Sequence, residues 1–137
     1  MNDPEFLFVY GTLRQGFQNP FASYLRQNAV YKGTGTFAGR LYNLGHYPGA
    51  VYDTQSSHQV VGEIYELKNA ALILKKLDDY EGINEPLPEY KRQKIEVQSE
   101  TGELVDCWIY LFILPTHGLQ LIAEGDYTKW RDNNLPL

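Results

Sequence analysis

Short runs of β-branched and aromatic residues recur through most of this chain and constrain its fold more than any other feature. Residues 6–10, 59–67, 90–98 and 104–114 are typical of strands. Residues 30–53 predict further strands, broken by glycines such as Gly33, Gly35 and Gly39. Gly102 lies between the last two runs, where it predicts a hairpin.

Two short helices are expected among these strands. Asn19 and Pro20 are a good N-cap and first residue for a helix over residues 21–27. Asn69 can cap a second helix over residues 70–80, which Gly82 would end. Residues 119–124 fit either a short helix or a strand, and residues 130–137 form a polar tail. Many strands with a few irregularly placed helices predict an α+β fold with a small mixed β-barrel flanked by short helices.

Length and composition narrow the class of protein. The 137 residues suit one domain over residues 1–137. A net charge of −5 argues against nucleic acid as a partner, and no apolar run has the length of a membrane span. One cysteine and no signal peptide indicate a cytoplasmic protein.

Several familiar motifs of binding and catalytic sites are only partly matched by this sequence. Gly11 and Gly16 have the spacing of a phosphate-binding loop, but the required lysine is missing after Gly16. Residues 33–38 loosely match a dinucleotide fingerprint, yet strand-like residues follow, so a bend or bulge in the sheet is expected. The three histidines are scattered, and Cys107 lies in an apolar run typical of a buried, inert thiol. We therefore expect no metal, no cofactor and no covalent nucleophile.

The predicted helix over residues 70–80 places a carboxylate on its buried face. Ala70, Leu74 and Leu77 share one face, and Glu81 is the next position on that stripe. Asp78 and Asp79 fall at the edge and on the opposite side, so both are expected to be solvated. Burial, the negative helix end and these two like charges should raise the pKa of Glu81, which suits a proton shuttle. The alternative is a frayed helix end with Glu81 in water.

The turn after the first strand is the second candidate. Tyr10, Gly11, Thr12 and Leu13 leave a buried strand, and successive backbone N–H groups in such a turn can bind an anion. Gly11 would allow close approach of a ligand. A simple strand-ending turn is the alternative.

These residues also carry a resemblance. Residues 8–14 with Gly16, residues 47–51, residues 62–67, residues 77–82, Tyr90 with Arg92, and residues 125–127 follow in order and resemble the γ-glutamylcyclotransferase-like family, including its avirulence-induced-gene-like branch. The match extends over nearly the whole chain.

The resemblance implies a γ-glutamylcyclotransferase-like fold and a specific reaction. A small γ-glutamyl amine or γ-glutamyl amino acid would be cyclised to 5-oxoproline with release of the amine. The family's catalytic acid falls on Glu81, and its substrate-binding turn falls on Tyr10, Gly11, Thr12 and Leu13. Because the substrate's own α-amine is the nucleophile, the reaction needs no serine, cysteine, metal or cofactor.

Three further features have open roles. The family reading puts Tyr90 at the cavity wall in contact with substrate and Arg92 nearby, and a surface pair on an edge strand is the alternative. Arg14 could assist the binding of a carboxylate, but a solvated arginine is the favoured expectation. Residues 84–89, with two prolines, form a loop expected at the lid or rim of the cavity. A non-catalytic ligand-binding or accessory domain with the same barrel is the competing function.

Overall fold

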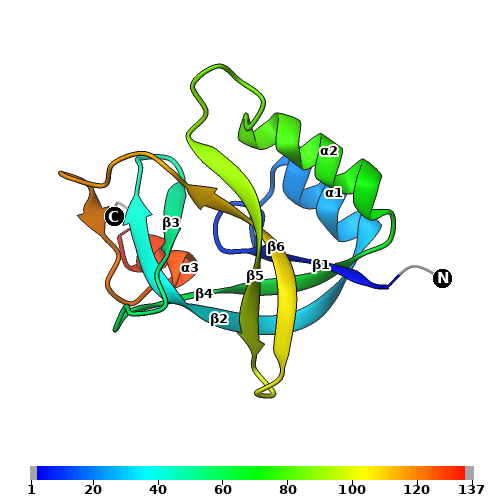
Figure 1. The fold of residues 1–137 in the computed structure, drawn as a ribbon, viewed down its shortest axis with the longest axis horizontal. Coiled ribbons are helices and arrows are strands. Elements are labelled where there is room, and N and C mark those ends of the chain that lie inside the picture. The colour runs from blue at the N-terminus through cyan, green and yellow to red at the C-terminus, as the bar shows by residue number, and fades with distance from the viewer. Residues whose placement is uncertain (1–2, 135–137) are drawn as a thin grey trace.

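A computed structural model describes residues 3–134 of the chain, and its centre is a closed five-stranded barrel (Figure 1). The barrel strands are β1 (Glu5–Val9), β2 (Ala29–Asn43), β4 (Gln59–Leu67), β5 (Tyr90–Ser99) and β6 (Leu104–Phe112). They pair in the order β2, β4, β1, β6, β5, and β5 returns to β2 to close the barrel. The β1–β6 pair is parallel and the other pairs are antiparallel. The predicted mixed barrel is therefore confirmed.

Strand β2 differs from its prediction. Gly33, Gly35 and Gly39, which were expected to divide residues 30–53 into several strands, lie inside one strand of 15 residues, whereas Gly45 does lie at the end of that strand's hairpin. Its register against β4 shifts between Tyr31 and Gly33, and Gly33 has a φ of 113°. The predicted bulge is thus confirmed, but the glycine bends the strand and does not end it. Beyond the barrel, β2 pairs with β3 (Pro48–Tyr52) and β7 (Gln120–Leu121).

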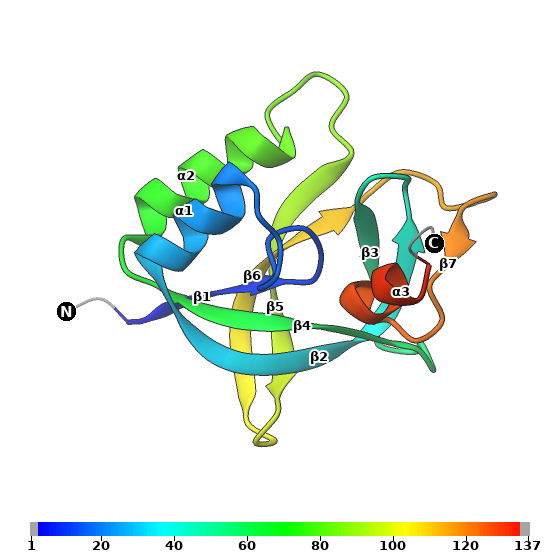
Figure 2. The ribbon, with the colours of Figure 1, turned by 180° about the vertical axis from the view of Figure 1, so that it is seen from behind.

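Helices α1 (Pro20–Asn28) and α2 (Ala70–Glu81) lie side by side on one flank of the barrel (Figures 1 and 2). Each is capped as predicted: the side chain of Asn19 accepts a 2.8 Å bond from Ala22 N, and that of Asn69 accepts from Leu72 N at 3.4 Å. Gly82 ends α2 with a φ of 68°, in the left-handed region that glycine favours. None of the helices within residues 3–134 is long and apolar enough to cross a membrane.

Helix α3 (Tyr127–Asn133) was not predicted from the sequence, which indicated a polar tail over residues 130–137. Residues 135–137 of that tail lie outside the described part of the chain. Asp126 caps the helix by accepting from Lys129 N at 3.1 Å. Packing on a distant segment holds it, since Phe17 stacks on Tyr127 with ring centroids 6.0 Å apart. A seven-residue helix has no periodicity long enough to reveal such packing. Residues 119–124 contain the short strand β7 rather than a helix.

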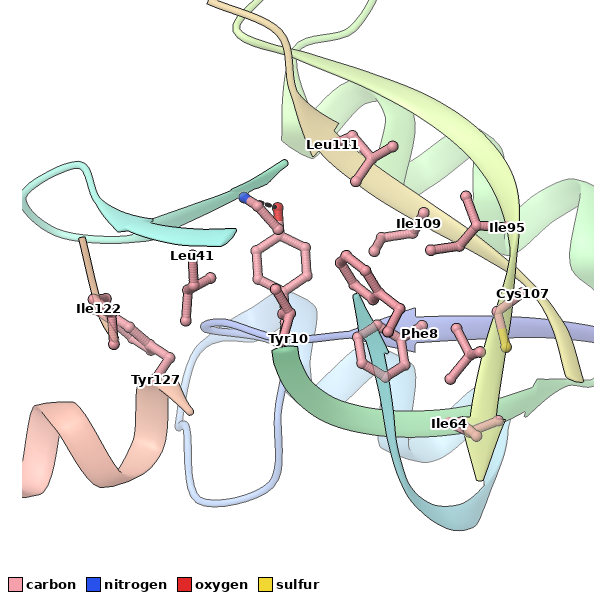
Figure 3. Close-up of a cluster of buried hydrophobic side chains, with 14 residues drawn as sticks. Phe8, Tyr10, Leu41, Ile64, Ile95, Cys107, Ile109, Leu111, Ile122 and Tyr127 are labelled. Atoms are coloured by element: carbon pink, nitrogen blue, oxygen red, sulfur yellow. Dashed lines mark hydrogen bonds between the residues drawn. The ribbon is translucent and has the colours of Figure 1, made fainter. Parts of the chain in front are cut away.

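Two buried clusters lie on opposite sides of β1, whose side chains alternate between them. Phe8 points into the barrel with Ile64 and Cys107 (Figure 3), whereas Leu7 and Val9 pack under α1 and α2. Cys107 is fully buried, as predicted, and burial raises the pKa of its thiol to about 12.

Candidate active site

A cavity of about 240 Å³ opens where β1 runs into the turn at residues 10–13, beside the end of α2. All six residues proposed from the sequence as site residues line it. The full lining consists of Phe8, Val9, Tyr10, Gly11, Thr12, Leu13, Tyr47, Pro48, Tyr80, Glu81, Glu89, Tyr90 and Tyr110. The volume is below the ~300–1,000 Å³ typical of small-molecule pockets. The site therefore suits a small ligand.

Glu81 is the last residue of α2, and its partly buried side chain faces this cavity. Burial raises the pKa of its carboxyl from 4.5 to about 7. Within residues 3–134, no group donates a hydrogen bond to this carboxylate. The direction of the shift agrees with the sequence analysis, but its cause is burial. One of the two expected like charges is paired with an arginine.

That like charge belongs to Asp78, and the prediction that Asp78 is solvated is wrong. It is 9% exposed, and Arg92 of β5 binds its two oxygens at 2.8 and 3.2 Å. Tyr110 of β6 donates a further bond of 2.7 Å to the same carboxylate. Arg92 is thereby held behind the cavity wall, with its guanidinium carbon 4.5 Å from the ring centroid of Trp108. Asp79 is exposed as predicted.

In the turn at residues 10–13, two carbonyl groups accept hydrogen bonds and three amides have no recorded turn or loop acceptor within residues 3–134. Gly11 O accepts from Arg14 N at 3.0 Å, and Thr12 O accepts from the side chain of Asn19 at 2.8 Å. In the described part of the chain, no loop or turn hydrogen bond is donated by the amides of Gly11, Thr12 or Leu13. Such amides at a cavity wall can bind a carboxylate.

Gly11 has a packing role that the sequence did not indicate. A Cβ atom at this position would lie 2.8 Å from Cγ and 2.9 Å from Cδ of Pro48. Glycine is therefore required for the approach of β3 to the turn, whatever ligand the cavity accepts.

Arg14 also departs from its prediction, because it is buried and ion-paired rather than solvated. Its Nε lies 3.1 Å from Glu63 of β4, and its Nη1 lies 2.9 Å from Asp126, the cap of α3. Glu63 also accepts a 2.8 Å bond from Gln15 N. This network ties the end of the turn at residues 10–13 to two other segments. Its partners are remote in sequence, so no local pattern reveals it.

The hydroxyl groups of the two predicted tyrosines are already engaged. Tyr10 donates a 2.5 Å bond to Tyr110 O. Its hydroxyl oxygen accepts a 3.3 Å bond from Ala50 N of β3, which is the dashed line in Figure 3. Tyr90 donates to Pro48 O at 2.7 Å, so its oxygen can still accept a bond from a ligand. Burial raises the pKa of both hydroxyls. Neither tyrosine can therefore act as a base at neutral pH.

Three aromatic and acidic residues at the open side of the cavity were missed as site residues. Tyr47 donates a 2.9 Å bond to Glu89, and Tyr80 lies with its hydroxyl 3.4 Å from that of Thr12. Glu89 is the one residue of the 84–89 loop that lines the cavity, and the loop connects α2 to β5 (Figure 1). The loop therefore forms part of the rim, as expected.

The chain is similar to known proteins over most of its length. The profile of the family described as "Gamma-glutamyl cyclotransferase, AIG2-like" matches residues 7–129. The gamma-glutamylcyclotransferase family protein YtfP of Escherichia coli is 34% identical over 122 residues, which cover 88% of this chain and 94% of that protein. The gamma-L-glutamyl-butirosin B gamma-glutamyl cyclotransferase of Niallia circulans is 31% identical over 94% of this chain and 77% of its own. The crystal structure of an AIG2-like protein from Mus musculus superposes with a TM-score of 0.71 at 29% identity, covering 92% of this chain and 89% of that one.

Proposed function

Because the chain belongs to the gamma-glutamyl cyclotransferase, AIG2-like family, we propose that it cyclises the γ-glutamyl group of a small γ-glutamyl amide to 5-oxoproline and releases the amine. The observation that carries the proposal is the position of Glu81. Its carboxyl, with a pKa of about 7, lines the same cavity as the free amides of the turn at residues 10–13.

Glu81 is proposed to move the proton. The α-amine of the substrate attacks its own γ-carbonyl carbon, and a carbon–nitrogen bond closes the five-membered ring. The Glu81 carboxylate accepts the proton that the attacking nitrogen loses. The same group then returns that proton to the leaving nitrogen as the original amide bond breaks. A pKa of about 7 keeps both the base and the acid forms populated at neutral pH.

The turn is proposed to hold the substrate. Gly11, Thr12 and Leu13 line the cavity, and within residues 3–134 their amides donate no turn or loop hydrogen bond, so they would be available to bind the α-carboxylate of the glutamyl group. Tyr90 would accept a bond from a substrate N–H, because its own proton is committed to Pro48 O. Tyr10 would contribute its ring and the rigid start of the turn. Holding the α-amine against the γ-carbonyl supplies much of the rate gain of an intramolecular reaction, so the proposal needs no cofactor.

The test is a turnover assay with the purified chain and a panel of γ-glutamyl amines and γ-glutamyl amino acids. We expect 5-oxoproline and the free amine to form in equal amounts from at least one member. Binding without any release would instead indicate the competing function, a ligand-binding domain that keeps the barrel and cavity.

A further inference from the structure

Asp78, Arg92 and Tyr110 form a polar cluster behind the wall of the cavity. Arg92 and Tyr110 are register partners on β5 and β6, so their side chains share one face of the sheet, and they meet at the Asp78 carboxylate. Nε and Nη2 of Arg92 lie 2.8 and 3.2 Å from its two oxygens. The Tyr110 hydroxyl donates a bond of 2.7 Å to the first of these oxygens. Both oxygens of Asp78 are therefore occupied, and its charge is matched by one guanidinium.

This cluster is adjacent to Glu81, which follows Asp78 by one helical turn. Residues three apart on a helix have Cβ atoms about 5–6 Å apart. The backbone carbonyl of Asp78 accepts a 3.2 Å bond from Ile83 N, which closes the helix just beyond Glu81. Tyr110 is a neighbour of both carboxylates, since it lines the cavity and its pKa is raised by burial, by the bond to Asp78 and by the charge of Glu81. The charges of the cluster therefore act on Glu81.

Arg92 is kept out of the cavity although its strand borders it. Tyr90 lines the cavity, and Arg92 follows it by two residues on the same face of β5, yet it is not part of the lining. Asp78 binds one edge of the guanidinium, and the ring of Trp108 lies 4.5 Å from its central carbon. Among the residues that the structure describes, the cavity is lined by no lysine, arginine or histidine. A guanidinium turned toward Glu81 would favour the ionised carboxylate, so little acid would remain to protonate the leaving nitrogen.

The other titratable groups around Glu81 bring no positive charge to it. Those that share the lining with Glu81 and Tyr110 are four tyrosines, which are uncharged at neutral pH, and one carboxylate at the rim: Tyr10, Tyr47, Tyr80, Tyr90 and Glu89. Lys91 of β5 is exposed on the other face of its strand from Arg92, and Arg26 of α1 donates to Phe17 O at 3.2 Å. Asp79 and Glu85, near the end of α2, are exposed. Within residues 3–134, Arg92 is therefore the cation whose position decides the charge around Glu81.

We infer that Asp78 is a positioning residue for the proposed reaction: it binds the Arg92 guanidinium and the Tyr110 hydroxyl outside the cavity and so keeps positive charge away from Glu81. The inference rests on the proposed function for the use of Glu81 as the proton shuttle. It gives Asp78 and Arg92 a joint role, because their charges cancel only while both are present. Arg92 left alone would stabilise the ionised form of Glu81, and Asp78 left alone would stabilise the protonated form.

The test is the titration of Glu81 itself. Carbon-13 NMR of the glutamate side-chain carboxyl groups follows it in the full chain, and Glu81→Gln identifies its signal. The wild-type midpoint is expected at about pH 7. Asp78→Asn keeps the shape of the side chain and leaves Arg92 unbalanced, so the midpoint should fall by about 1 pH unit. Arg92→Gln leaves Asp78 unbalanced and should raise it by a similar amount. The double variant Asp78→Asn with Arg92→Gln should return to the wild-type midpoint.

Two control variants separate charge from packing. Arg92→Lys keeps the charge but loses the forked contact with the carboxylate, so the Glu81 midpoint should stay near that of the wild type even where stability falls. Asp79→Asn removes the same charge from the exposed side of the helix and should move the midpoint far less. If Asp78→Asn does not fold, Arg92→Gln decides by the sign of its effect, because the Arg92 side chain is 24% exposed and less of it is lost from the interior.

Two results would overturn the inference. One is the same Glu81 midpoint in the wild type and in both single variants, and the other is a change of the same sign in both, which would indicate a general loosening of the helix end. The acid limb of kcat/KM, measured in parallel, should move with the midpoint. If the wild-type chain yields no 5-oxoproline, the proposed function fails, whereas the titration still decides whether Asp78 and Arg92 control the charge around Glu81.

Discussion

The guanidinium of Arg14 lies 3.1 Å from the carboxylate of Glu63, and both side chains are buried. The same guanidinium reaches Asp126, 2.9 Å away, at the start of α3. The end of the turn that borders the candidate site is thereby joined to a barrel strand and to the last helix. We expect this arrangement to control both the stability of the fold and the shape of the turn.

Removing the Arg14 guanidinium should lower the free energy of unfolding strongly. In Arg14→Met, two carboxylates are left without their cation in a buried place, and loss of one partner of a buried pair typically costs about 3–5 kcal/mol. Urea unfolding followed by circular dichroism measures the loss. Lys32→Met is the matched control, because Lys32 pairs with Glu66 at 3.5 Å on the exposed surface, and it should cost less than about 1 kcal/mol. An equal loss of unfolding free energy in the two variants would show that the buried Arg14 network stabilises the fold no more than an exposed ion pair.

Glu81→Gln should remove turnover and keep binding. Glutamine has nearly the same shape but cannot accept or return a proton, and general acid–base groups contribute about 10²–10⁴-fold. The measurement is kcat for 5-oxoproline formation, with the affinity for a γ-glutamyl ligand measured in parallel. Asp79→Asn, an exposed carboxylate two residues earlier, is the control and should lose far less. Retention of more than about a tenth of the wild-type kcat would rule out the proton shuttle.

The raised pKa of Glu81 predicts two pH effects of opposite direction. The ionised form is the base, so kcat/KM should fall as the pH drops below about 7. In the folded chain the carboxyl holds its proton up to about pH 7, whereas in the unfolded chain it has the ordinary glutamate pKa of 4.5. The folded state therefore binds more protons between these values, and stability is lost as the pH rises through that window.

The stability effect can be isolated with the same substitution. Because glutamine does not ionise, Glu81→Gln should be more stable than the wild type by about 1–3 kcal/mol at pH 8. The two proteins should converge near pH 4, where Glu81 is protonated in both states. Urea unfolding at the two pH values measures this, and a stability difference that is independent of pH would contradict it.

Gly11→Ala should disturb both the fold and the site. The new Cβ would lie within 2.9 Å of two Pro48 atoms, and overpacking of this kind costs about 1–3 kcal/mol. The turn must shift to relieve the contact, so KM should rise while kcat changes less. Adding Pro48→Ala removes both contacting atoms and should recover stability. A single variant with unchanged stability would contradict the packing role assigned to Gly11.

Cys107 should be inert toward thiol reagents. It is fully buried, and its pKa of about 12 leaves almost no thiolate at neutral pH. Thiol reagents should label Cys107 slowly in the native chain, and labelling should become fast only when the chain unfolds. Cys107→Ala should lower stability by about 1–2 kcal/mol with unchanged kcat. Rapid inactivation that substrate prevents would instead indicate a covalent mechanism.

Local features of the sequence were enough to predict the elements that carry the site. The caps at Asn19 and Asn69 and the stop at Gly82 depend on groups within four residues, so they are readable from short patterns. The buried stripe of α2 likewise selects Glu81 by spacing alone, and a strand ending at Gly11 predicts the turn.

Tertiary structure alone decided which charges are buried. Asp78 and Arg14 look like solvated residues in the sequence, yet each is held by partners 14 to 112 residues away, brought close by the closing of the barrel. Helix α3 and the Tyr47–Glu89 pair at the rim depend on similarly remote contacts. A sequence pattern reports the periodicity of one segment, whereas the burial and pKa of a charge depend on which other segments fold against it.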